Sequence, residues 1–220
     1  MWGGMLGGLL RDGEACLEHA QALRSLGAKQ PAFAGLADVN AGRALMLRGS
    51  WEEGVDHLRK AIAFHKAVGL TSQLMWAKLD EAEFFASQGE VDDALALIAD
   101  ALAYTEELAQ IRSPALRQRA DLLAQSDAEP SAIEASYRAA IEGASSQGAR
   151  YYELQATTPF ARWLKSQRRA AEAQTLLAEI YGWFTEGFDT PALKEAKTLL
   201  DELSNEPGVV SPSDVSANSR

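Results

Sequence analysis

Apolar side chains recur along most of this chain with the period of an α-helix. The segment 91–108 has its apolar residues on one face of a 3.6-residue period. They are Val91, Ala94, Leu95, Ile98, Ala101 and Leu102. The segment from Ala173 has the same spacing, with Leu176, Leu177, Ile180, Tyr181 and Phe184. No segment shows sustained alternation of β-branched residues, so the pattern predicts an all-α fold without strands.

A final helix is predicted after Thr190, which suits an N-cap, and Pro191, which suits the first helical position. The apolar side of this helix comprises Leu193, Ala196, Leu199, Leu200 and Leu203. From Asn205 onward the chain is rich in serine and proline and has no apolar period. We therefore expect residues 205–220 to be a disordered tail.

The helical segments repeat. Four copies combine a polar turn with an alanine-rich amphipathic helix: LRGSWEEGVDHLRKAI from Leu47, ASQGEVDDALALIADAL from Ala86, QSDAEPSAIEASYRAAI from Gln125 and KSQRRAAEAQTLLAEIY from Lys165. Their turns recur about every 40 residues, at Gly49, Gly89, Glu129 and Arg169. A partial copy covers 11–27, and partner helices are predicted at 31–47, 71–87, 113–125 and 150–167.

Small residues occupy the positions where the two helices of a hairpin must approach closely. They are Ala44, Ala61, Ala82, Ala101, Ala140 and Ala161. One hairpin cannot bury its apolar face alone, so about five hairpins, the first one partial, should stack into a solenoid. The prediction is one repeat domain over 1–204, with the helix after Thr190 capping its open end.

Such helix pairs, with a small residue at the turn and alanines at the contact, resemble tetratricopeptide repeats, which form a right-handed superhelix. The longer unit of this chain resembles the repeats of the maltose-regulator type of signalling ATPase. The run ARWLKSQRRAAEAQTLLAEIYGWFTEGFDTPALKEAKTLLDEL, Ala161 to Leu203, resembles the C-terminal end of bacterial proteins that carry a class III adenylate cyclase domain and an AAA-type ATPase module. Its most recognisable block is YGWFTEGFDT, Tyr181 to Thr190. The chain has no G-x-x-x-x-G-K-[ST] loop and no room for a cyclase domain, so it resembles the repeat region alone.

The charge balance argues against a nucleic-acid partner. The 220 residues carry 21 Lys and Arg against 31 Asp and Glu, a formal net charge of −10, and binding to phosphates needs a basic surface. The nearest approach to a basic patch comprises Arg162, Lys165, Arg168 and Arg169, which we interpret as a solvated helix end.

Cysteine usage and the N-terminal segment bear on location and assembly. A single cysteine, Cys16, excludes an intramolecular disulfide and favours a reducing, cytoplasmic compartment. The opening MWGGMLGGLL is too short and glycine-rich for a membrane helix. Leu6, Leu9 and Leu10 in the first repeat could expose apolar surface and support a homodimer.

No constellation for catalysis, a cofactor or a metal is recognisable. Gly49 to Gly54 has the glycine spacing of a phosphate loop, but Val55 and Asp56 replace the lysine and hydroxyl residue. Cys16 and His19 lie three residues apart on one predicted helix, but two ligands are too few for zinc. His57 and His65 lie eight residues apart on another predicted helix, and no third ligand is recognisable for either pair. We therefore expect a non-enzymatic protein.

The remaining candidates are contact residues. Tyr151 and Tyr152 either pack within the fold or, with Gln155, face an inner groove where a peptide or small ligand binds. Arg43, Trp76 and Arg162 complete the set of possible partner contacts. Trp163, Trp183 and Phe184 are expected to pack the last hairpin against the capping helix. The leading interpretation is a protein-binding scaffold. The resemblance implies that its partner is an ATPase or cyclase domain. The alternative is a sensor that binds a small molecule inside the superhelix.

Overall fold

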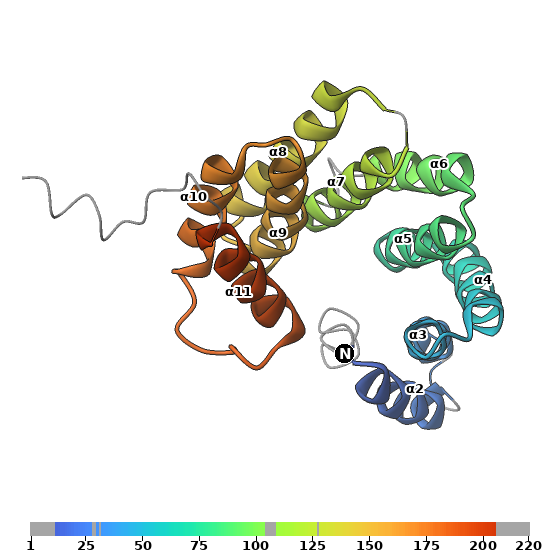
Figure 1. Cartoon of the computed structure of the whole chain (residues 1–220). Helices are drawn as coiled ribbons and strands as arrows, with labels where there is room; N and C mark the ends of the chain where they lie inside the picture. The colour runs from blue at the N-terminus through green and yellow to red at the C-terminus, as the bar shows by residue number, and fades with distance from the viewer. Residues whose placement is uncertain (1–11, 28–29, 31, 104–108, 127, 206–220) are drawn as a thin grey trace, which may run out of the picture. The chain divides into compact units, whose positions relative to one another are not determined.

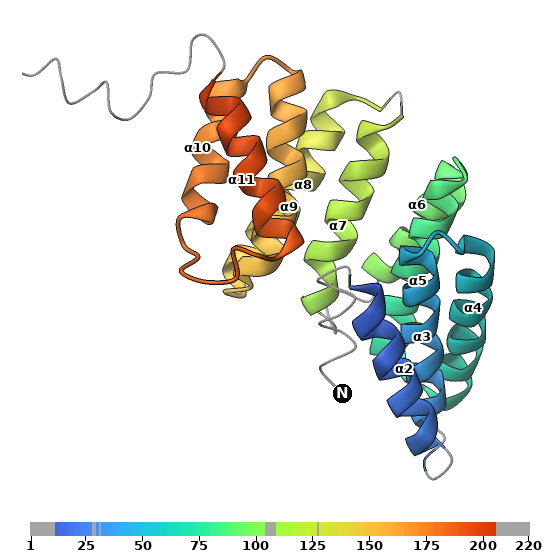
Figure 2. The same cartoon turned by 60° about the horizontal axis from the view of Figure 1, so that its bottom comes forward.

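The computed structural model describes residues 12–27, 30, 32–103, 109–126 and 128–205. These residues form ten α-helices and no strand, which confirms the all-α prediction (Figures 1 and 2). The chain divides into two compact units, Met1–Leu122 and Leu123–Arg220. Of the predicted tail only Asn205 is described, and Leu6, Leu9 and Leu10 of the predicted dimer surface lie outside the described residues.

Unit 1 contains six helices, the last of which ends just beyond the unit boundary. They are α2 (Gly13–Gly27), α3 (Ala32–Leu47), α4 (Trp51–Val68), α5 (Thr71–Ser87), α6 (Val91–Leu102) and α7 (Ala109–Ala124). Unit 2 contains α8 (Pro130–Ser146), α9 (Arg150–Ser166), α10 (Ala170–Tyr181) and α11 (Pro191–Ser204).

The predicted helix boundaries hold within a residue or two for most elements, with three exceptions. Helix α7 starts at Ala109, four residues before the predicted 113. Helix α6 ends at Leu102, and residues 104–108 of its predicted continuation lie outside the described part. Helix α10 ends at Tyr181, so Phe184 follows the helix. Gly182 keeps right-handed dihedrals, and the amides of Trp183 and Phe184 then turn back onto the Ile180 and Tyr181 carbonyls, three residues earlier.

Five helix ends share one turn geometry. In each, a residue with positive φ follows the helix, and the next amide donates to the carbonyl five residues earlier, as in a Schellman motif. The positive-φ residues are Gly49, Gly69, Gly89, Gly148 and Arg168. In the last hairpin the turn residue is thus Arg168, one position before the predicted Arg169, and a side chain with φ +62° costs roughly 1 kcal/mol there.

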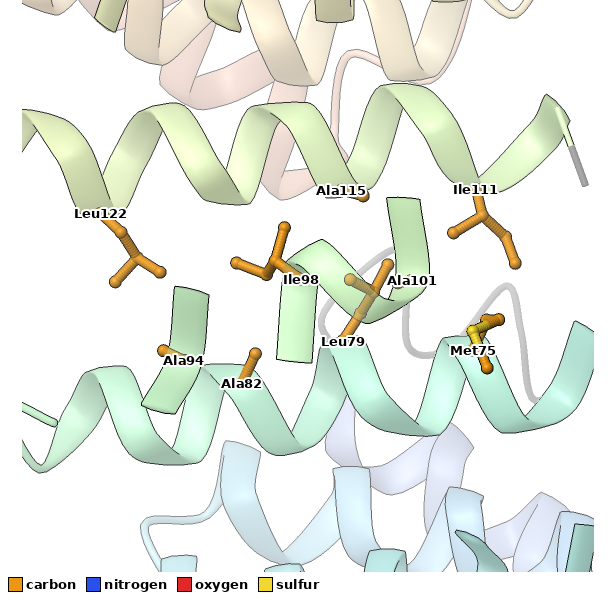
Figure 3. Packing of buried hydrophobic residues seen from close by; sticks show 9 residues of the cluster. All are labelled: Met75, Leu79, Ala82, Ala94, Ile98, Ala101, Ile111, Ala115 and Leu122. Carbon is orange, nitrogen blue, oxygen red and sulfur yellow. The ribbon is translucent and has the colours of Figure 1, made fainter. Parts of the chain in front are cut away.

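The six alanines predicted at hairpin contacts are all buried, at 1% exposure or less. Figure 3 shows the packing that they permit in unit 1, where α5, α6 and α7 enclose one apolar cluster. Its members are Met75, Leu79, Ala82, Ala94, Ile98, Ala101, Ile111, Ala115 and Leu122. Small residues let the helices approach, and the larger side chains fill the space between them.

Helices α3 and α4 approach most closely at two glycines. A Cβ atom on Gly42 would lie 2.8 Å from the Gly54 carbonyl oxygen, and one on Gly54 would lie 2.9 Å from the Gly42 carbonyl oxygen. Both distances are too short for carbon and oxygen, so neither position has room for a side chain. The backbones of α3 and α4 therefore pack directly against each other here.

His65 lies at the other end of the same helix pair and is fully buried. Neither ring nitrogen has a hydrogen-bond partner, and a Cβ on Gly35 of α3 would lie 2.6 Å from Nε2. Burial lowers the pKa of the His65 imidazole below its ordinary 6.5. The imidazole is thus a neutral packing element against the α3 backbone.

In unit 2, α9 contacts α8, α10 and α11, while α11 also packs on α10. Helix α11 buries Leu193, Ala196, Leu199 and Leu203, as its predicted apolar side requires. Thr190 and Pro191 occupy the N-cap and first helical positions. The Thr190 hydroxyl, however, donates to the Gly187 carbonyl (2.7 Å) instead of accepting a bond from the helix.

Four charged side chains connect α8 to the start of α10. Arg169 donates to both carboxylate oxygens of Glu134 (2.6 and 3.1 Å) and to Glu172, and Arg138 bonds the same two glutamates. Hydrogen bonds from Arg169 lower the pKa of Glu134 to about 2, with Arg138 adding to the effect. This network ties together two helices that are separated in sequence by α9.

We predict that Gly42→Ala destabilises the chain by roughly 1–3 kcal/mol, because the new methyl group forces α3 and α4 apart. Gly143→Ala in α8 is the matched control, because a Cβ there meets nothing within 4 Å. It should stabilise by about 0.5–1 kcal/mol through helix propensity. Thermal unfolding of both variants checks this, and equal shifts would contradict the close packing at Gly42.

We also predict that His65 makes the protein acid-sensitive. The unfolded chain protonates this residue near pH 6.5, whereas the folded chain resists protonation, so the contribution of His65 to stability falls as the pH drops below 6.5. The slope contributed is at most about 1.4 kcal/mol per pH unit. As the pH is lowered from 7.5 to 5, the unfolding midpoint should fall less steeply in His65→Leu than in the wild type. Lys66→Gln, at an exposed neighbouring position, should keep the wild-type slope.

Candidate functional site

The six predicted contact residues all lie on helices that precede a hairpin turn. Arg43 is on α3 and Trp76 on α5, both in unit 1. Tyr151, Tyr152, Gln155 and Arg162 are on α9 in unit 2. They are therefore considered as two sets, each within its own unit.

Arg43 forms a mostly buried ion pair. Its Nε donates to Asp80 Oδ2 over 2.7 Å, and the two side chains are only 14% and 17% exposed. Burial raises the pKa of Asp80 to about 6, against the opposing effect of Arg43 and with added repulsion from Glu83. Because the pair connects α3 to α5, Arg43 serves the packing of unit 1.

Trp76 is half-buried and packs against the apolar cluster of Figure 3. Cys16 is fully buried, and its burial raises the pKa of its thiol. Neither residue presents reactive chemistry on the surface. The unit 1 candidates thus lie close to its core.

On α9, Tyr151 and Gln155 lie one turn apart and are half-buried, as is Tyr152. Burial raises the pKa of the Tyr151 phenol, and a hydrogen bond with Gln155 opposes this. These residues form a half-buried polar strip. Such a strip suits contact with a partner but has no nucleophile with an adjacent base.

Arg162 lies at the far end of α9 and is engaged by the last helix. Its Nη2 donates to Glu195 Oε1 over 2.9 Å, with both side chains more than half exposed. One turn further, Lys165 donates to Glu202 over 3.0 Å. With Arg169 bound to Glu134 and Glu172, three of the four residues of the candidate basic patch are held in ion pairs.

The least expected surface is the connection between α10 and α11, residues 182–190, which we call the aromatic loop. Trp183 is 58% exposed and Phe188 45% exposed. The interpretation of Trp183 as a packing residue of the last hairpin was wrong, because Trp183 lies beyond the end of α10 at Tyr181 and most of it is exposed. Trp163, by contrast, is half-buried and stacks on Phe160 with centroids 6.0 Å apart.

Intramolecular contacts hold the aromatic loop in place. The Trp183 ring meets Phe184 edge-on at 5.2 Å, and the Arg150 guanidinium lies 5.9 Å from its centroid. Phe188 contacts Tyr181, the last residue of α10, at 5.8 Å. The loop therefore presents two aromatic side chains on a fixed support. The sequence signal for it was the pair Gly182 and Gly187 around an aromatic run.

The three histidines do not come together. His57 Nδ1 lies 2.8 Å from Asp38 Oδ1, between α4 and α3, whereas His65 is buried without a partner. Among the residues that the structure describes, no group of three His, Cys, Asp or Glu side chains could hold a metal ion. Across that same part of the chain, no helix combines the length and apolarity needed to cross a bilayer.

No family model matches the chain, and no curated protein matches it. The relationship to tetratricopeptide repeats and to cyclase or ATPase proteins therefore stays a prediction from sequence.

We predict different roles for the two arginines on these helices. Arg43→Ala leaves the Asp80 carboxylate buried without its cation and should destabilise the chain by about 3 kcal/mol. Arg162→Ala breaks an exposed pair and should cost less than about 1 kcal/mol. Urea denaturation of the two variants separates these cases. Near-equal effects would mean that Arg43 is not a structural tie.

Proposed function

We propose that this chain is a non-catalytic, protein-binding scaffold built from stacked helix hairpins of tetratricopeptide-like form. Five turns with the same hydrogen-bond geometry and the buried alanines of the helix contacts support this architecture. Repeated hairpins bury their apolar faces on their neighbours and offer extended surfaces for binding.

The observation that carries the proposal is the exposure of Trp183 and Phe188 in one short, supported loop. Single exposed apolar residues are common on protein surfaces and need no explanation. Two large aromatic side chains five residues apart are different, because aromatic residues are enriched where proteins bind each other. The contacts to Phe184, Arg150 and Tyr181 restrict the loop before any partner arrives, which reduces the entropy lost on binding.

The surface of helix α11 supports the proposal that it caps one end of the stack of hairpins. It covers α9 and α10 with a leucine face. Its opposite side is polar and exposed, with Lys194, Glu195, Lys197, Asp201 and Glu202. Terminal repeats require such a polar outer face, so α11 is proposed to cap the stack.

The resemblance of Ala161 to Leu203 to the end of cyclase and ATPase proteins suggests the kind of partner. In that context the scaffold would bind a signalling protein with an ATPase or cyclase domain, in the cytoplasm. The most recognisable block of the resemblance, Tyr181 to Thr190, contains the aromatic loop.

The test is capture of partners from native lysate with the full chain as bait. We expect the double variant Trp183→Ala, Phe188→Ala to lose its specific partners roughly tenfold or more, because truncating aromatic anchors removes most of the binding energy. The control is Leu26→Ala with Val68→Ala, which removes two exposed apolar side chains from unit 1. Quantitative mass spectrometry reads the result, and thermal unfolding verifies that both variants fold.

Two outcomes would count against the proposal. One is a bait that captures nothing above background. The other is a set of partners that the aromatic variant and the control retain equally, which would place binding away from the loop.

A further inference from the structure

We propose that the aromatic loop docks a basic segment of the partner protein, in which Lys or Arg side chains alternate with apolar ones. This inference rests on the proposed function and adds the chemistry of the partner. It is carried by three exposed carboxylates that lie in the aromatic loop or close to it in the sequence.

The carboxylates are those of Glu179, Glu186 and Asp189, and all three are exposed. None of them forms an ion pair with any residue that the structure describes. Between Arg169 and Lys194 the sequence contains no Lys or Arg at all. The loop is therefore an acidic patch with no internal counter-charge nearby in sequence.

Elsewhere in unit 2 most acidic side chains are paired. Glu134, Glu153, Glu172, Glu195, Asp201 and Glu202 each contact a Lys or Arg at 3.0 Å or less. Glu129 and Glu142 are exposed and likewise lack such a pair with any described residue. The loop differs from them in that its carboxylates accompany two exposed aromatic side chains.

Helix electrostatics explain one of the three acidic residues but not the others. Asp189 comes just before α11, where the positive end of the helix dipole favours a carboxylate. Glu179 lies in the last turn of α10, where the dipole disfavours it. Glu186 belongs to neither helix. An external cation would favour the Glu179 and Glu186 carboxylates, which gain nothing from the helix dipoles.

The rings themselves suit a cation. The Arg150 guanidinium already lies over the Trp183 ring, so this indole accepts a cation within the unit. More than half of the Trp183 side chain and nearly half of Phe188 stay exposed to solvent. Aliphatic stems of Lys or Arg can cover these rings while their charged groups meet the carboxylates. An acidic segment would be repelled, and a purely apolar one would leave the carboxylates desolvated and unpaired.

The experiment uses two labelled probe peptides of equal length, one with Leu and Lys at helical spacing and one with Glu in place of each Lys. Fluorescence anisotropy with the full chain measures their binding. We expect the basic peptide to bind at least tenfold more tightly than the acidic one. Its affinity should fall as salt rises.

Paired variants locate the binding. Glu179→Gln with Glu186→Gln should weaken the basic peptide at least fivefold, and Trp183→Ala should weaken it comparably. Glu129→Gln with Glu142→Gln is the control, since it removes the same charge from exposed, unpaired carboxylates of α8 and its N-cap. The control should change the affinity less than twofold. Equal losses in both double variants would overturn the proposal, because binding would then follow net charge alone.

The same variants separate this inference from the proposed function. One outcome is that Trp183→Ala loses the lysate partners while Glu179→Gln with Glu186→Gln keeps them and high salt does not release them. In that case the loop binds proteins, but the inference that the bound segment is basic is wrong. If Trp183→Ala loses no partner, the proposed function fails at this loop as well.

Discussion

The structure depends on how closely neighbouring helices can approach. At Gly42 and Gly54 the α3 and α4 backbones leave no room for a methyl group, and buried alanines take the equivalent role in the other hairpins. Close approach buries large side chains such as Leu58 and Phe160 completely. It also places polar groups in dry surroundings, which is why the Arg43–Asp80 pair and the neutral His65 exist in unit 1.

The helices could be predicted from the sequence because their apolar period is strong and their ends carry turn residues. Glycines 49, 89 and 148 follow the helices that they terminate, and the boundaries of α3, α5 and α9 match the prediction within a residue. The prediction failed at Phe184 because apolar residues continue at helical spacing after α10 has ended at Tyr181. Periodicity reports a helix only while the backbone continues it.

The candidate contacts were harder to predict than the helices. Arg43 and Arg162 look equivalent in sequence, yet one lies in a mostly buried pair and the other in an exposed one. Ion pairs between residues more than 30 positions apart depend on tertiary structure, and no local pattern encodes them. For the same reason the exposure of Trp183 could not be predicted, since an aromatic residue suits a core and an interface equally well.

The shared turn geometry has a consequence for how such a chain can change over evolutionary time. Each of these helix-end turns is held by the same backbone hydrogen bond and tolerates different side chains, as Arg168 at a position that is otherwise glycine illustrates. A duplicated or deleted segment that begins and ends at such turns would preserve every helix end. The number of hairpins in such a molecule can therefore change without altering the turn at any helix end.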